Sequence, residues 1–185
     1  MRIAVVGSAG TGKTTLAKAL AAHLGCAYLA DTVHQVLRDR GRDSWRGVEV
    51  GDRRKIREEA LQRKLRLEAD APAFVSDKSV IDYLAYWLQN QSEHEQRHVN
   101  DAFVDQCKEG ALRYDLLVFL PYRADVDYAV GRNQDPVHNL KVAAHKRGLL
   151  VLLGLPHIEA PYSFGEDVGA WCERWVTPNL HKPAH

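Results

Sequence analysis

Eight consecutive residues near the start of the chain combine the residue types that bind phosphate. They fit the pattern G-x-x-x-x-G-K-[ST] at every fixed position. Glycine allows backbone dihedrals and a close approach that a Cβ would block, so that successive N–H groups can turn onto phosphate oxygens. The predicted nucleotide-binding residues are Gly7, Ser8, Ala9, Gly10, Thr11, Gly12, Lys13 and Thr14, with Thr15 as a further phosphate contact.

The side chains at the end of this loop suit a nucleoside triphosphate with a magnesium ion. Lys13 would place a positive charge on the β- and γ-phosphates, and the Thr14 hydroxyl would coordinate Mg²⁺. The run Ile3 to Val6 is apolar and β-branched, whereas Thr15 to Leu24 has helical spacing. The loop therefore joins a strand to the N-terminus of a helix, whose dipole favours anions, and we predict ATP and Mg²⁺ as cofactors.

Two acidic residues follow other apolar runs. Asp31 ends the run Cys26 to Ala30, and Asp77 ends the run Ala73 to Ser76. The carboxyl ends of parallel strands meet at one edge of a sheet, so both carboxylates are expected beside the phosphate loop. The structural alternative for Asp77 is a cap on the following helix.

Apolar runs alternate with segments of helical spacing along the rest of the chain. The further expected strands are Leu116 to Leu120 and Leu155 to Ala160. The further expected helices span about Val33 to Arg40, Asp52 to Ala69, Ser79 to Gln89, Glu93 to Leu112 and Pro136 to Leu153. This alternation predicts an α/β fold, a three-layer α/β/α sandwich around a five-stranded parallel sheet.

Basic residues on two of these helices are interpreted as solvated faces. They are the Arg and Lys run within 52–69 and the group Lys141, His145, Lys146 and Arg147. The alternative interpretation for the run within 52–69 is a phosphate-binding role.

The segments around these acids resemble a known family, the P-loop small-molecule kinases. The likeness is greatest to the NadR-type ribosylnicotinamide kinase domains and related AAA-type ATP-binding proteins, and more distant to thymidylate kinases. The matching stretches are the phosphate loop, Asp31 to His34, Phe74 to Ser79, Asp82 to Tyr86 and Tyr114 to Leu120. The resemblance implies the P-loop NTPase fold with strand order 2-3-1-4-5, and one kinase-like domain over residues 1–176 followed by a tail at 177–185.

The resemblance also implies roles for residues on the acceptor side. Asp77 would activate the acceptor hydroxyl or order Mg²⁺. Asp82, Tyr83 and Tyr86 would face the acceptor, although ordinary packing of an amphipathic helix explains the two tyrosines equally well. Asp31 and His34 are also candidate acceptor contacts, but His34 and Lys78 stand where the relatives usually have other residues, often Arg.

A polar, glycine-punctuated stretch at about 121–134 lies where such kinases place a mobile lid. Its candidate catalytic residues are Arg123 and Arg132, because a guanidinium can spread charge over the γ-phosphate during transfer. Solvated loop arginines are the alternative interpretation.

A second motif, H-E-x-x-H at His94 to His98, resembles a zinc site, but we reject it. The surrounding residues are polar on nearly every helix face, and Arg97 would bring positive charge beside the metal. Cys26, Cys107 and Cys172 lack C-x-x-C spacing and are expected to be reduced, buried thiols.

Composition excludes several other classes. The chain has 185 residues, 45% of them hydrophobic, with 25 Lys and Arg against 24 Asp and Glu, which argues against a large nucleic-acid footprint. No apolar stretch approaches the length of a membrane span, and no signal peptide is apparent, so a cytoplasmic location without membrane contact is expected.

The sequence thus predicts a kinase that moves the γ-phosphate of ATP to a small acceptor, above all a nucleoside or nucleotide. One alternative is a nucleotide-binding regulatory NTPase, or switch, that signals to a partner. Another is a kinase that acts on a modified base or an end of a nucleic acid. The oligomeric state is not predicted.

Overall fold

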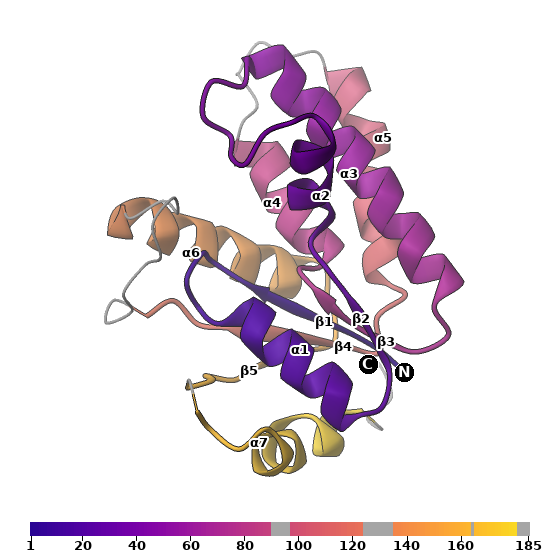
Figure 1. Ribbon diagram of the computed structural model, residues 1–185, viewed down its shortest axis with the longest axis vertical. Coiled ribbons are helices and arrows are strands. Elements are labelled where there is room, and N and C mark those ends of the chain that lie inside the picture. Colours follow the sequence, from indigo (N-terminus) through magenta and orange to yellow (C-terminus); the bar gives the residue numbers. More distant parts are fainter. Residues whose placement is uncertain (90–96, 124–134, 164, 181–185) are drawn as a thin grey trace.

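A computed structural model describes residues 1–89, 97–123, 135–163 and 165–180 (Figure 1). The strands are β1 (Arg2–Gly7), β2 (Ala27–Leu29), β3 (Phe74–Asp77), β4 (Leu116–Leu120) and β5 (His157–Glu159). The helices are α1 (Lys13–His23), α2 (Thr32–Asp39), α3 (Val50–Asp70), α4 (Val80–Gln89), α5 (Arg97–Ala111), α6 (Pro136–Leu152) and α7 (Val168–Trp175), with a 3₁₀ turn at Thr177–Asn179.

The five strands form one parallel sheet in the order β2-β3-β1-β4-β5, as predicted. β1 is central, with Val5 paired to Asp77 of β3 on one side and to Val118 of β4 on the other. β1, β3 and β4 are buried on both faces, which is why they consist of nearly continuous apolar runs. The register places Asp77 beside the end of β1, where the phosphate loop begins.

Helices cover both faces of the sheet, and each face has its own core. Ile3 and Val5 pack with α1 and α7, whereas Ala4 and Val6 pack with α3, α4 and α5. This division follows from the alternation of side chains along a strand. Figure 1 shows the resulting layers, with α1 and α7 on one side of the sheet and the other helices on the opposite side. The predicted three-layer α/β/α sandwich is confirmed.

The chain after β5 differs from the sequence prediction. α7 was not predicted, although its Trp171 is fully buried and its Nε1 donates a hydrogen bond to the carbonyl of Pro161 at 2.9 Å. The signal was weak because the helix has only eight residues. Part of the expected tail is also structured, since the 3₁₀ turn lies within it and Leu180 packs against the core beside α7.

The predicted helix from Pro136 to Leu153 is confirmed as α6, which ends at Leu152 with Leu153 as its C-cap. Leu149 and Leu150 face the core, whereas Val151 and Leu152 are exposed.

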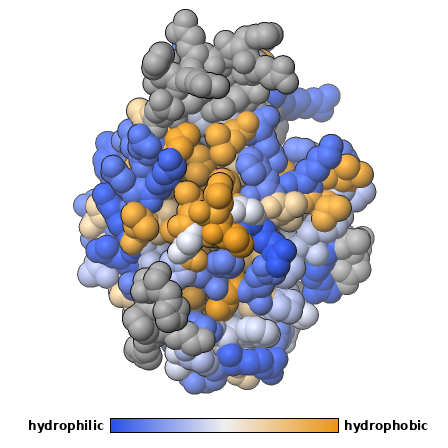
Figure 2. Space-filling view, turned by 180° about the vertical axis from the view of Figure 1, so that it is seen from behind, coloured by the Kyte–Doolittle hydropathy of each residue, from blue (hydrophilic) through white to orange (hydrophobic). Residues whose placement is uncertain are grey.

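Figure 2 shows apolar side chains gathered near the centre of the face opposite to the view of Figure 1. Within the described residues, no helix is both long and apolar enough to cross a membrane. Cys107 and Cys172 are buried free thiols, as predicted, whereas Cys26 is half-buried.

We expect Trp171→Ala to lower the free energy of unfolding by about 3–5 kcal/mol, because it removes a fully buried aromatic side chain from the α1–α7 core. Denaturant unfolding measures the loss. Trp175→Ala is the matched control on the same helix and should cost less, since Trp175 is only half-buried. Equal losses for the two variants would contradict the placement of α7.

Candidate active site

The phosphate loop connects β1 to α1 as predicted. Gly10 and Gly12 have φ values of 78° and 87°, in the left-handed region that favours glycine. A Cβ on Gly7 would lie 2.8 Å from the carbonyl oxygen of Leu120, so this position requires close approach of two backbones. The Thr11 hydroxyl donates to the carbonyl of Ser8 at 3.1 Å, which holds the turn closed.

Lys13, the lysine of this loop, is buried but has no carboxylate partner among the described residues. Its Nζ donates a hydrogen bond to the carbonyl of Ser8. Burial, reinforced by the nearby Lys146 ammonium, lowers the pKa of Lys13 to about 7. The loop therefore holds a desolvated amine that an arriving anion would favour in its charged form.

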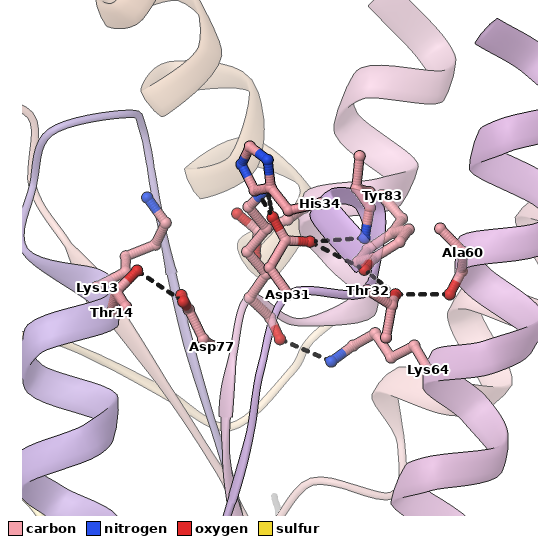
Figure 3. A network of polar contacts seen from close by, with 12 residues as sticks. Lys13, Thr14, Asp31, Thr32, His34, Ala60, Lys64, Asp77 and Tyr83 are labelled. Atoms are coloured by element: carbon pink, nitrogen blue, oxygen red, sulfur yellow. Dashed lines mark hydrogen bonds and ion pairs between the residues drawn. The ribbon is translucent and has the colours of Figure 1, made fainter. Parts of the chain in front are cut away.

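Asp77 is joined to the phosphate loop by a hydrogen bond. The Thr14 hydroxyl donates to Asp77 Oδ2 at 2.6 Å (Figure 3). The Tyr28 hydroxyl donates to the same oxygen at 3.4 Å. Asp77 Oδ1 is buried without a hydrogen-bond partner among the described residues. A buried carboxylate oxygen without a donor, beside a threonine hydroxyl, is a donor set that suits a hard divalent cation or its bound water.

Asp77 does not cap α4, which removes the structural alternative. Ser79 performs that role, because its Oγ accepts from the N–H of Ile81 at 3.1 Å. Asp82 reaches back to the N–H of Ser79 at 2.8 Å and completes a capping box.

Tyr28 was missed by the sequence analysis; burial, together with the negative charge of Asp77, raises its pKa to about 12.

Asp31 lies next to this site at the start of α2. Its Oδ1 accepts from the N–H of Val33 at 3.0 Å, so it caps the helix, and its Oδ2 pairs with the Lys78 ammonium. His34 Nε2 lies 3.6 Å from the same oxygen and is largely exposed. Burial by itself would raise the pKa of Asp31, but the Lys78 ammonium outweighs burial and the net pKa is lowered.

Lys78 owes its position to an unusual backbone. Its φ of 73° makes it the one described non-glycine residue with a positive φ. The buried Lys64 ammonium of α3 donates to the Lys78 carbonyl at 2.7 Å and to Ser76 Oγ at 2.6 Å, and it pairs with Glu68 at 2.7 Å. Lys64 is therefore a structural residue, and α3 is not simply a solvated face as predicted.

Tyr83 lies behind Asp31 rather than on a free surface. Its hydroxyl and Thr32 Oγ1 are 2.6 Å apart, and it also donates to Asp31 Oδ1 at 3.4 Å. Thr32 Oγ1 in turn donates to the carbonyl of Ala60 at 2.7 Å. Figure 3 shows this chain of contacts from α3 to Asp31. Tyr83 is buried, which supports the interpretation that it packs in the core rather than facing an acceptor. Its hydroxyl helps to hold Asp31 in place.

Asp82 and Lys146 form a buried ion pair that sequence analysis missed. Their side chains are each 1% exposed, and Lys146 Nζ lies 2.6 Å from Asp82 Oδ1. The same ammonium donates to the carbonyl of Gly7 at 2.6 Å and lies 4.8 Å from the centre of the Tyr86 ring. Both predictions are corrected: Lys146 is not on a solvated face, and Asp82 binds Lys146 and Ser79 instead of facing an acceptor.

The remaining predicted residues are placed only in part. Arg123 follows β4, and its Nη1 donates to Ser163 Oγ at 3.4 Å, so it lies against the segment between β5 and α7. Arg132 and most of the expected lid lie outside the described residues, as do His94 and Glu95 of the rejected zinc motif. Within the described parts of the chain, no group of His, Cys, Asp or Glu could hold a metal by itself.

Comparison with known proteins identifies the family. Residues 2–166 match the family described as AAA domain, so the chain belongs to it. A search of curated proteins found no match.

Solved structures with this fold include several kinases. NadR in complex with NR has a TM-score of 0.68 at 16% identity over 92% of this chain, which spans only 50% of NadR. Deoxyadenosine kinase from M. mycoides with bound dATP has a TM-score of 0.55 at 15% identity, with 94% of this chain and 96% of the kinase covered. Shikimate kinase from Acinetobacter baumannii with shikimate gives 0.56 at 16% identity over 93% and 89% of the two chains. The fold is that of the P-loop kinases.

We expect nucleotide binding to take up a proton above pH 7. In the free protein the pKa of Lys13 is about 7, so the amine is mostly neutral at pH 8. Bound phosphates favour the ammonium and raise this pKa, so affinity should fall as pH rises above 7, by about tenfold per pH unit at most. Calorimetric titration with Mg-ADP at pH 8, in two buffers of different ionisation enthalpy, counts the protons.

Lys13→Met is the control for this titration, because it should bind more weakly and without the same proton uptake. No uptake by the unmodified protein at pH 8 would contradict a neutral Lys13 in the free state.

We expect Lys146→Met to lower the free energy of unfolding by about 3–5 kcal/mol, since it leaves the Asp82 carboxylate buried and unpaired. Combining it with Asp82→Asn should cost less than the sum of the two single changes. Urea unfolding measures all three variants. Lys141→Met, at an exposed position of the same helix, is the control. If Lys146→Met lowered the free energy of unfolding no more than the control does, the Asp82–Lys146 pair would not stabilise this region.

Proposed function

We propose that the protein is an ATP- and Mg²⁺-dependent phosphotransferase that moves the γ-phosphate to a small acceptor. One observation carries the proposal: the buried Lys13 has no carboxylate partner among the described residues, while Asp77 beside it is bound to Thr14 and keeps one buried oxygen free of donors. A positive charge and an anionic ligand oxygen are thus held ready on one loop, in a fold shared with known kinases.

The loop residues 7–15 provide the nucleotide site of this proposal. Backbone N–H groups of the loop and of the start of α1 bind the phosphate oxygens, and Lys13 binds the β- and γ-phosphates. Thr14 and Asp77 would hold Mg²⁺ directly or through its bound water. When bound, the ion neutralises charge that develops between the β- and γ-phosphates.

On the acceptor side, Asp77 would also accept a hydrogen bond from the attacking oxygen. In the transfer, a bond forms between that oxygen and the γ-phosphorus as the bond to the β,γ-bridging oxygen breaks, and the acceptor proton passes to Asp77 or to water. Asp31 and His34 would contact the acceptor, because His34 is exposed and Asp31 is held beside Lys78. Arg123 and Arg132 would bind the γ-phosphate from the segment after β4.

A panel of acceptors tests the proposal. The purified protein is incubated with Mg-ATP and with nucleosides, nucleoside monophosphates or other small hydroxyl compounds, and phosphorylated product is measured. We expect product with at least one of them, and a loss of several orders of magnitude for Lys13→Ala without unfolding. ATP hydrolysis that needs a protein partner, with no phosphorylated acceptor, would instead favour the switch.

Asp77→Asn is the sharper variant, since it keeps the shape and removes the charge. We expect turnover to fall on the order of a hundredfold, with a much smaller change in ATP affinity, because the carboxylate acts mainly in the transition state. Asp39→Asn, at an exposed end of α2, is the control. Normal turnover of Asp77→Asn would remove Asp77 from the chemistry.

A further inference from the structure

Arg53 and Arg57 of α3 are two guanidinium groups without an acidic partner in the part of the chain that the structure describes. Neither forms an ion pair with a carboxylate among the described residues, although both are half-buried. The acids near them on the same helix are already engaged. Asp52 pairs with Lys55 at 3.8 Å, Glu58 pairs with Arg54 at 3.3 Å, and Glu59 pairs with Arg40 at 2.7 Å and with Arg63 at 3.3 Å.

These two arginines are held in place by contacts that leave their charge uncompensated. Arg53 Nε donates to the carbonyl of Val48 at 2.8 Å. The guanidinium of Arg57 lies 5.0 Å from the centre of the Trp45 ring, a cation–π contact that supplies no negative charge. Trp45 itself packs against the core. The chain therefore orders both side chains at the cost of an unfavourable like-charge pair one helical turn apart.

Tyr86 connects this pair to the proposed active site. Its ring lies 4.8 Å from the Lys146 ammonium, which holds the start of the phosphate loop. Tyr86 also lies near both Arg57 and Lys78, because it acts to raise the pKa of each. Burial and the neighbouring Arg53 lower the pKa of Arg57, which is the effect expected of a cation held without an anion.

We propose that Arg53 and Arg57 bind a phosphate monoester group of the acceptor, so that the substrate is an anionic compound rather than a neutral nucleoside. The planar, bidentate donors of two arginines match the oxygens of a phosphate, and two positive charges balance its double charge at neutral pH. The inference rests on the proposed kinase function and specifies its substrate class.

The test begins with binding, which does not depend on catalysis. The protein is saturated with Mg-ADP to fill the phosphate loop and is then titrated with nucleoside 5′-monophosphates and with the matching nucleosides. We expect at least one monophosphate to bind at least tenfold more tightly than its nucleoside. Arg57→Gln and Arg53→Gln should remove most of this margin and leave nucleoside binding unchanged.

Arg66→Gln is the matched control, because it removes one charge from an exposed position of the same helix. Circular dichroism checks that all three variants fold. The subsite would be overturned if Arg57→Gln still bound the monophosphate more tightly than the nucleoside by the same factor, or if Arg66→Gln reduced that factor equally. It would also be overturned if the unmodified protein showed no preference for monophosphates, or preferred compounds that carry a carboxylate instead of a phosphate.

The same panel in the presence of Mg-ATP separates the two proposals. Transfer to neutral nucleosides that Arg57→Gln leaves intact would keep the kinase and overturn the anion subsite. Tight, arginine-dependent binding of monophosphates without phosphorylated product would keep the subsite and overturn the kinase. Arginine-dependent transfer to a monophosphate would support both.

Discussion

Three buried or half-buried ammonium groups and three carboxylates have to be balanced within one site, and the rest of the site depends on how they are paired. Lys146 pairs with Asp82, and Lys78 pairs with Asp31. The remaining two groups, Lys13 and Asp77, do not form an ion pair. Lys13 donates a hydrogen bond to a carbonyl of its own loop, while Asp77 accepts one from Thr14. An unpaired buried charge is costly, so this separation is stable only if the lysine can lose its proton or gain an anionic ligand.

The Lys146–Asp82 and Lys78–Asp31 ion pairs hold the structural elements around Lys13 and Asp77 in place. Lys146 joins α6 to α4 and to the end of β1 through the Gly7 carbonyl. Lys78 joins the start of α2 to the end of β3 and is itself held by Lys64 of α3. Side chains that are locked by buried ion pairs lose little further entropy when a ligand arrives, which favours a preorganised site. The phosphate loop therefore rests on structure contributed by six separate elements.

The charges on α3 divide by position along the helix. Lys64 and Glu68, near its middle and end, are buried and paired, and Glu68 also accepts from the Tyr114 hydroxyl at 2.9 Å. Arg53 and Arg57, near its start, have no such partners among the described residues. This division separates the groups that stabilise the fold from the two groups for which we propose a role in binding a ligand. Helical periodicity alone does not make that distinction, because all four residues are simply charged positions in the sequence.

The sequence by itself determined the elements whose signals are local. The glycines of the phosphate loop, the apolar runs of β1, β3 and β4, and the Pro136 start of α6 act through dihedral preferences and burial within a few residues. Placing Asp77 at the loop required one further rule, that parallel strands end at the same edge. Only the tertiary structure decided the partners of Lys146 and Asp82, the burial of Tyr83 and the docking of α7. Lys146 lies 139 residues from Gly7 along the chain, and whether its ammonium is solvated or buried depends on what the fold packs against it.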